Sequence, residues 1–488
     1  MNKTDHEPRK PRRGLRRWKV WLIIGMAHVL GFVSSFHAIM STRTSQGAIA
    51  WAVSLNAFPY VAVPAYWVLG RNKFQGYVTA RRARDSETLE RLGEIAAKAS
   101  PYFVADADKS NAARAAERLA ELPILRGNDV ELLIDGEQTF SSILQGIDAA
   151  ESYILFQFYI VHDDEIGRKV KSHLIRKAEQ GVRVYFLYDE VGSYDLPESY
   201  KDELRSAGAE VKNFHTRQGP GNRFQINFRN HRKVVVVDGH AAWVGGHNVG
   251  DEYLGRNPKF GHWRDTHVRI DGPTALTAQL SFAEDWYWAS GDILELDWTP
   301  KPSKNADMPV LIVPSGPADE LETTALMFVH AINSAEERIW IASPYFVPDE
   351  SVMHALQLAG LRGVDVRILI PEKPDHMLVY LAAFSYFEDA SRTGVKFFRY
   401  GDGFLHEKAM LIDHDVAAVG TANFDNRSFR LNFEITALIA DPEFAVEVKR
   451  MFEADFAKSR MIGPGEYSDR SLWFRLGVRL ARLTSPLL

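Results

Sequence analysis

Two copies of one pattern of polar residues lie far apart in this chain of 488 residues. The pattern is H-x-K-x4-D-x6-G-[GT]-x-N, and its polar members are His231, Lys233, Asp238 and Asn248 in the first copy and His406, Lys408, Asp413 and Asn423 in the second. At about one chance in twenty per position, five fixed residue types at fixed spacing arise roughly once in a few million starting points. Two copies therefore predict a functional pair rather than a coincidence.

The spacing inside each copy suits an extended chain. A histidine and a lysine two residues apart on a strand point to the same face, because side chains alternate. The apolar runs 234–237 and 409–412 that follow are expected to be the buried remainder of each strand. Two lobes packed face to face would then bring two imidazoles and two ammonium groups around one phosphate.

Such a cluster is suited to in-line substitution at phosphorus. One imidazole can attack while the other protonates the departing alkoxide. Lys233 and Lys408, with Asn248 and Asn423, are the predicted phosphate-binding groups, because they supply charge and donors to the phosphoryl oxygens. This chemistry requires no metal and no cofactor, and we predict none.

A neutral imidazole nucleophile needs its second ring nitrogen to be anchored. Glu434 lies 434 − 406 = 28 residues after His406, and Asp265 lies 265 − 231 = 34 residues after His231. Either carboxylate can accept an N–H from the neighbouring histidine. We therefore predict Asp265 and Glu434 to be the residues that orient the histidines.

The elements around the motifs alternate between strands and helices. Segments 130–134, 153–160 and 182–188 are expected to be buried strands, and 165–179 an amphipathic helix. Segments 151–160 and 181–184 are echoed by 337–347 and 363–366. This repetition predicts an α/β protein with two similar lobes, each a mixed or mainly parallel sheet flanked by helices.

The N-terminal region differs from this globular pattern. Residues 20–40 and 47–69 are mostly apolar, and each is long enough to cross a hydrocarbon core about 30 Å thick. They predict a two-helix transmembrane hairpin. Basic residues flank both outer ends, from Arg9 to Lys19 and from Arg71 to Arg84, so both ends and the rest of the chain are expected in the cytoplasm. The competing interpretation is a signal peptide followed by a buried core helix.

These observations divide the chain into six predicted segments. They are a basic tail (1–19), the transmembrane hairpin (20–70), a helical linker (71–124), lobe 1 (125–298), lobe 2 (305–465) and an amphipathic C-terminal segment (466–488). In the last segment, residues 472–483 place three arginines on one helical face, which suits an anionic membrane surface. Packing of this helix on the catalytic lobes is an equally good interpretation.

Composition narrows the function classes. The net charge is −5, so no global field favours nucleic acid, and none is expected as a partner. The chain has no cysteine, which excludes disulfides, a cysteine nucleophile and thiolate metal sites.

The two H-x-K-x4-D copies resemble those of the phospholipase D superfamily. Within it, the chain is similar to bacterial cardiolipin synthases over nearly its whole length, most specifically at 245–253, 263–267, 313–317, 343–346 and 423–428. The resemblance implies a phosphatidyltransferase of the bacterial inner membrane. One phosphatidylglycerol donates its phosphatidyl group to a histidine and releases glycerol, and the hydroxyl of a second lipid then takes that group from the phosphohistidine.

The resemblance also implies the roles of single residues. The catalytic set is His231, Lys233, Asp238, His406, Lys408 and Asp413. His231 would be the nucleophile and His406 the acid–base, although the sequence itself is nearly symmetric. Asp238 and Asp413 are expected to support the structure of the motif. Gln157 departs from the pattern, because an acidic residue is expected there.

Several functions stay open at this point. A lipid hydrolase would use water in place of the second lipid, and phosphatidylethanolamine could replace phosphatidylglycerol as one substrate. A nuclease of the same superfamily is disfavoured by the acidic balance and the apolar spans. An inactive membrane scaffold is disfavoured because both motifs are intact.

Overall fold

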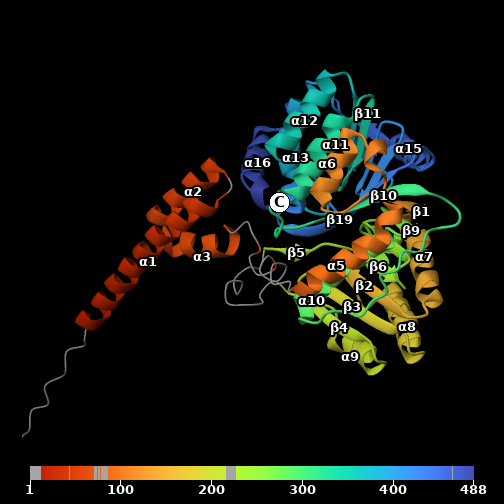
Figure 1. The fold of residues 1–488 in the computed structure, drawn as a ribbon. Coiled ribbons are helices and arrows are strands. Elements are labelled where there is room, and N and C mark those ends of the chain that lie inside the picture. Colours follow the sequence, from red (N-terminus) through yellow and green to blue (C-terminus); the bar gives the residue numbers. More distant parts are fainter. Residues whose placement is uncertain are drawn as a thin grey trace, which may run out of the picture. The chain divides into compact units, whose positions relative to one another are not determined.

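A computed structural model describes residues 13–42, 44–70, 74, 77, 86–215, 227–463 and 465–488 (Figure 1). The described residues fall into two compact units. One unit holds the three N-terminal helices, and the other holds Tyr77 and all elements from α5 onward. Most of the predicted basic flanks, residues 1–12 and the arginines and lysine from Arg71 to Arg84, lie outside the described residues.

The N-terminal unit consists of α1 (Arg13–Ser41), α2 (Ser45–Ala57) and α3 (Pro59–Leu69). Within α1, the segment Trp18–Ser41 is long and apolar enough to cross a membrane. Helix α1 packs against both α2 and α3. At the α1–α2 crossing the backbones come so close that a Cβ on Gly31 would lie 2.2 Å from the carbonyl oxygen of Leu55.

The predicted second span through residues 47–69 is not one continuous helix. It is interrupted at Phe58, whose φ of −136° and ψ of 60° leave the helical region. Pro59 explains the interruption, because proline lacks an N–H and its ring disfavours a helical conformation in the residue before it. With 11 residues, α3 is too short to cross a bilayer by itself.

The second unit begins with the predicted helical linker, which holds α5 (Ser86–Ala99) and α6 (Asn111–Ala120). Lobe 1 follows, with the elements β1 (Leu125–Ile134), α7 (Asp135–Ala149), β2 (Tyr153–Phe158), α8 (Glu165–Glu179), β3 (Arg183–Asp189), α9 (Glu198–Ser206), β4 (Glu210–Phe214), β5 (Arg229–Asn230), β6 (Val234–Val237), β7 (Ala241–Gly245), β8 (Trp263–Arg264), β9 (Thr266–Asp271) and α10 (Ala275–Ser290). The predicted helix 165–179 is confirmed. It begins after Asp164, whose side chain caps the N–H of Gly167 at 3.0 Å.

Lobe 2 repeats this order. Its elements are β10 (Met308–Ser315), α11 (Thr323–Ser334), β11 (Arg338–Ala342), β12 (Phe346–Val347), α12 (Glu350–Leu361), β13 (Asp365–Pro371), α13 (Met377–Ser391), β14 (Lys396–Tyr400), β15 (Phe404–Leu405), β16 (Ala409–Ile412), β17 (Val416–Gly420), β18 (Phe424–Asp425), α14 (Asn426–Arg430), β19 (Asn432–Ala440), α15 (Pro442–Ala457), β20 (Ser459–Met461) and α16 (Leu472–Arg482). The expected repeat of two similar lobes is confirmed, because α11 to α13 occupy in lobe 2 the places of α7 to α9 in lobe 1 (Figure 1).

The two lobes share one continuous sheet. Its order is β20-β14-β13-β11-β16-β17-β19-β10-β1-β9-β7-β6-β2-β3-β4, and β1 pairs with β10 antiparallel at the centre. The lobes are therefore joined edge to edge rather than by stacking two separate sheets. Each half is mixed: β2, β3 and β4, like β11, β13 and β14, run parallel, and the strands nearer the centre pair antiparallel.

Helices cover both faces of the sheet. In lobe 1, Phe156 and Phe186 pack in one core with residues of α7 to α9, and Tyr185, one position along, meets Trp286 of α10 on the opposite face. In lobe 2, α11 to α13 cover one face, and Trp340 contacts Phe452 of α15 on the other. Burial on both faces explains why these strands are almost continuously apolar.

Candidate active site

Both H-x-K segments lie in extended chain immediately before a short buried strand. His231 and Lys233 stand between β5 and β6, and His406 and Lys408 stand between β15 and β16. The predicted strands 234–237 and 409–412 are confirmed as β6 and β16. The polar residues precede these strands rather than belong to them, so they are held by other contacts.

Those contacts come from the opposite lobe. Strand β5 pairs in parallel with β19, where Phe433 faces Asn230, and the N–H of His231 donates to the carbonyl of Phe433 at 2.9 Å. Strand β15 pairs in parallel with β8, where Leu405 faces Arg264, and the N–H of His406 donates to the carbonyl of Arg264 at 2.8 Å. The next residue on each partner strand is the predicted carboxylate, so the register places each histidine beside the carboxylate of the other lobe.

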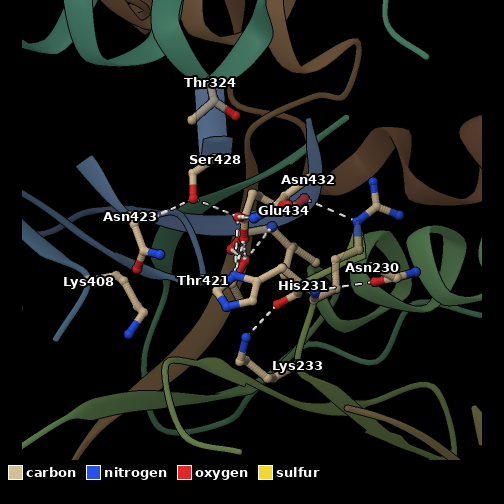
Figure 2. A network of polar contacts seen from close by, with 12 residues as sticks. Asn230, His231, Lys233, Thr324, Lys408, Thr421, Asn423, Ser428, Asn432 and Glu434 are labelled. Atoms are coloured by element: carbon tan, nitrogen blue, oxygen red, sulfur yellow. Dashed lines mark hydrogen bonds and ion pairs between the residues drawn. The ribbon is translucent and has the colours of Figure 1, made fainter. Parts of the chain in front are cut away.

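His231 is oriented by Glu434. Its Nδ1 lies 2.9 Å from Oε2 and 3.1 Å from Oε1 of this fully buried carboxylate (Figure 2). Three further donors fix the carboxylate: Thr421 Oγ1 at 2.6 Å, Ser428 Oγ at 2.8 Å and Asn432 Nδ2 at 3.1 Å. A carboxylate held this way keeps Nδ1–H on the imidazole and leaves Nε2 free for chemistry.

His406 contacts Asp265 in a similar way, and Lys408 Nζ also lies 2.7 Å from Nδ1 of this imidazole. Its Nδ1 lies 2.6 Å from Asp265 Oδ2, and Asp265 Oδ1 accepts the N–H of Thr266 at 2.8 Å. Both predicted carboxylates contact a histidine in the structure, but the partners are exchanged. Glu434 serves His231 and Asp265 serves His406, whereas sequence separation within each lobe suggested the opposite assignment.

The [GT] position of the motif differs between the lobes for a steric reason. A Cβ on Gly246 would lie 2.0 Å from Oδ1 of Asp265, so only glycine leaves room for this carboxylate. The equivalent Thr421 instead donates its hydroxyl to the longer side chain of Glu434. The [GT] alternative in the motif thus matches the Asp or Glu that stands behind each histidine.

Burial shapes the charges of this cluster. Burial lowers the pKa of Lys408 to about 8, although Asp265 and Glu434 act in the opposite direction. Burial likewise lowers the pKa of Lys233 well below its ordinary value. Lys233 Nζ donates to the carbonyl of His231 at 2.6 Å, and Lys408 Nζ donates to the carbonyl of His406. In Figure 2 both ammonium ends and the imidazole of His231 point toward the same region.

Burial favours the neutral form of both histidines. Burial lowers the pKa of His231 to about 4 against the raising effect of Glu434. Burial, followed by the charges of Lys408 and Lys233, lowers the pKa of His406 well below its usual value. Burial alone would raise the pKa of Glu434, but His231 and Lys233 outweigh it and hold that pKa below the ordinary range. A neutral imidazole paired with an ionised carboxylate is the state that a nucleophile requires.

The remaining motif residues occupy two different places. Asp238 and Asp413 lie at the far ends of β6 and β16, with φ of 50° and 48°, and each accepts backbone N–H groups at the start of a neighbouring strand. Asp238 takes those of residues 151–153 at 2.8 Å, and Asp413 takes those of residues 336–338 at 2.8–3.2 Å. The structure does not bring them to the histidines, in keeping with a supporting role.

The two asparagines also differ from each other. Asn248 is occupied on both sides, because Oδ1 accepts the N–H of Ile160 at 3.2 Å and Nδ2 donates to Tyr253 at 3.1 Å. Asn423 has a buried Oδ1 with no hydrogen-bond partner among the residues that the structure describes, and its backbone N–H donates to Ser428. Of the two, Asn248 is the one whose side-chain amide is already engaged at both its oxygen and its nitrogen.

A second buried network stands behind His231. Asp285 accepts from Arg232 at 2.9 Å, from Asn230 and Gln157 at 2.7 Å, and from Tyr77 at 2.9 Å. Arg232 also donates to the carbonyls of Glu434 and Ser315, and so ties lobe 1 to lobe 2. Gln157, where the resemblance led us to expect an acidic residue, supplies a neutral donor here, whereas an acidic residue would place a second carboxylate against Asp285.

Comparison with known proteins places this arrangement in a family. A family described as "Cardiolipin synthase, PLD-like domain" matches residues 143–286 and 328–456. The chain belongs to this family. It is 49% identical over 471 residues to cardiolipin synthase A of Pseudomonas fluorescens, covering 96% of this chain and 98% of that protein. Cardiolipin synthase A of Pseudomonas entomophila is 48% identical with the same coverage.

The fold is also found in a crystal structure of a phosphatidylserine synthase from Haemophilus influenzae. It superposes with a TM-score of 0.56 at 18% identity, over 78% of this chain and all of that one. This likeness concerns the fold alone. Family membership makes the chain an enzyme of the phosphatidyltransferase type and associates it with the membrane, in agreement with the apolar helix α1.

Sequence analysis missed several residues of the cardiolipin synthase-like site. Thr421, Ser428 and Asn432 complete the shell of donors around Glu434. Thr421 occupies a motif position and Ser428 lies in the matched segment 423–428, so both were within reach of the pattern. Asp285 carried no such signal, because it lies in a helix remote from both motifs.

Proposed function

We propose that the protein is a cardiolipin synthase that transfers a phosphatidyl group from one phosphatidylglycerol to the hydroxyl of a second phospholipid through a phosphohistidine. The observation that carries the proposal is the pair of exchanged contacts, His231 to Glu434 and His406 to Asp265. They give two neutral, oriented imidazoles at the junction of the lobes, with Lys233 and Lys408 beside them.

The first half of the reaction forms the covalent intermediate. Nε2 of His231 attacks phosphorus, the bond from phosphorus to the glycerol oxygen breaks, and His406 gives its Nε2 proton to the departing alkoxide. The phosphodiester carries a negative charge, which offsets the two ammonium charges that lower the pKa of His406 in the free protein. Substrate binding therefore allows His406 to hold the proton that it must donate.

The second half returns the enzyme to its starting state. The hydroxyl of the acceptor lipid attacks phosphorus, His406 takes its proton, and the bond from phosphorus to His231 breaks. Lys233, Lys408 and Asn423 bind the phosphoryl oxygens as charge develops on them. Asp238 and Asp413 keep the motif strands in register and take no part in proton transfer.

Hydrolysis is the second candidate, since water can replace the acceptor lipid at the same intermediate. The 49% identity to a cardiolipin synthase favours transfer. Phosphatidylethanolamine in place of one phosphatidylglycerol is the alternative substrate pair, and both would pass through the same histidine.

The N-terminal unit supports a proposal for the location. We place α1 across the bacterial inner membrane, with α2 and α3 returning the chain and the catalytic lobes in the cytoplasm, as the positive-inside tendency favours. Because the chain has no cysteine, Ser45→Cys at the exposed first residue of α2 tests this directly. A membrane-impermeant maleimide should label it in intact cells, and labelling only after lysis would contradict the topology.

The reaction is tested with purified protein and phosphatidylglycerol alone, with products identified by mass spectrometry. Cardiolipin and released glycerol are expected, and both should be lost in His231→Ala. Phosphatidic acid without cardiolipin would establish hydrolysis instead. Product that appears only after phosphatidylethanolamine is added would assign the alternative substrate pair.

A further inference from the structure

Helix α16, near the end of the chain, has two apolar faces. The inner face packs on α13: Phe474 meets Phe384 edge to face at 5.0 Å, and Val478 and Ala481 are buried. The outer stripe consists of Leu472, Trp473, Leu476, Leu480 and Leu483, all exposed. At about 100° per residue these five side chains lie within an arc of about 100°, nearly opposite the inner face.

Three residues of the outer stripe are more than two-thirds exposed. Trp473 is 80% exposed, Leu483 76% and Leu472 69%. A helix at the surface of a soluble domain normally turns polar side chains outward once one face is packed. A continuous outward stripe of leucine and tryptophan indicates a surface that another phase or molecule covers.

The charges beside the stripe identify the chemistry of that phase. Arg475, Arg479 and Arg482 lie together on one flank of α16, between its inner and outer faces. Arg479 lies over the ring of Tyr467 at 5.7 Å and Arg482 over that of Tyr386 at 5.4 Å. If the outer stripe faces the acyl chains of a bilayer, the arginines on the flank lie at the depth of the headgroups. This arrangement suits an interface with anionic headgroups.

The helix is also tied to the active site. Directly after α16, the carbonyl of Leu488 accepts the N–H of Arg427 at 2.7 Å, and Tyr386 donates to Ser485 at 3.2 Å. Arg427 belongs to α14, whose Ser428 donates to Glu434 at 2.8 Å. The end of the chain after α16 is therefore connected by hydrogen bonds, over the short helix α14, to the carboxylate that contacts His231.

We propose that the outer stripe of α16 lies in the interface of an anionic lipid bilayer and docks the catalytic lobes onto the membrane that contains their substrate. This contact is additional to the span α1, and it goes beyond the proposed reaction. Its first readout requires no activity, so its failure is distinguishable from failure of the proposed chemistry.

The absence of cysteine allows single-site labelling of the full chain. Leu476→Cys is labelled with a polarity-sensitive fluorophore and reconstituted in vesicles of phosphatidylcholine with phosphatidylglycerol. Ile293→Cys, at an apolar position of lobe 1 that is 64% exposed against 46% for Leu476, is the matched control. We expect a blue shift at 476, quenching by brominated acyl chains, and an aqueous spectrum at 293.

An activity measurement gives the second readout. Leu476→Glu with Leu480→Glu should lower turnover of phosphatidylglycerol in vesicles by about tenfold or more, because two charges must enter the acyl boundary. Turnover of a short-chain phosphatidylglycerol dispersed as monomers should be unchanged, which also reports that the variant is folded. Ile293→Glu should leave both rates unchanged.

Three results would overturn the proposal. The label at 476 could stay aqueous, or labels at 476 and 293 could shift equally. Alternatively, the shift at 476 could follow protein concentration and ignore brominated lipid, which would assign the stripe to a second copy of the chain.

Discussion

Glu434→Gln removes one charge from the site and changes little else. The carboxylate has no exposed surface and accepts from four side chains. Glutamine has the same shape, and its Oε1 can keep the hydrogen bonds from Ser428 and Asn432. Its Nε2 then faces Thr421, whose hydroxyl can rotate to accept, and Nδ1 of His231, which cannot both accept and keep its proton.

The expected magnitude follows from this tautomer change. With the amide donating to Nδ1, the proton of His231 moves to Nε2, the nitrogen that must attack. Wrong-tautomer substitutions beside a catalytic histidine cost about 10²–10⁴-fold in rate, or about 3–5 kcal/mol of transition-state stabilisation. We expect cardiolipin formation to fall by that factor while the protein stays folded.

A change of leaving group separates the two histidines. Phosphatidyl-p-nitrophenol needs no general acid, because nitrophenolate departs without a proton. Glu434→Gln should remain slow on this substrate, since attack by His231 is impaired. The matched control, Asp265→Asn, disturbs His406 instead, so its first half-reaction, measured as the initial burst of nitrophenolate, should recover most of its loss.

The exchanged pairing is what this comparison tests. Recovery by Glu434→Gln and none by Asp265→Asn would mean that the roles of the two histidines are reversed. Equal behaviour of both variants on both substrates would refute the assignment of one carboxylate to each histidine.

Three further changes have expected outcomes. Lys408 has a pKa of about 8, so its side chain is positively charged below that pH and neutral above it. The rate should therefore fall as pH rises through about 8, and Lys408→Arg should remove this fall from the pH–rate profile. Asp238→Ala leaves three backbone N–H groups without an acceptor and should lower the free energy of unfolding by about 2–5 kcal/mol. Asp238→Asn should lower it much less, and thermal unfolding that ranks the two variants the other way would contradict the supporting role of Asp238. Gly246→Ala places a Cβ 2.0 Å from Oδ1 of Asp265 and should slow transfer about 10²-fold, with recovery on phosphatidyl-p-nitrophenol; an unchanged rate would show that the carboxylate has room to move.

Part of the fold could be predicted because its signals are local. Helix 165–179 follows from an aspartate cap, an apolar period and Gly181 at its end, and strands 234–237 and 409–412 follow from short apolar runs after a polar pair. The interruption of the second apolar segment also had a local signal in Pro59, but length and composition outweighed it in the prediction.

The sequence by itself determined which residues meet at the site. Two copies of one motif, with Asp265 and Glu434 downstream, specify the two imidazoles, ammonium groups and carboxylates without any coordinates. Only the tertiary structure decided how they combine. Parallel pairing of β5 with β19 and of β15 with β8 places each histidine beside the carboxylate of the other lobe. Those pairings join segments about 140 and 200 residues apart, and their register depends on packing at the lobe junction, which no local periodicity encodes.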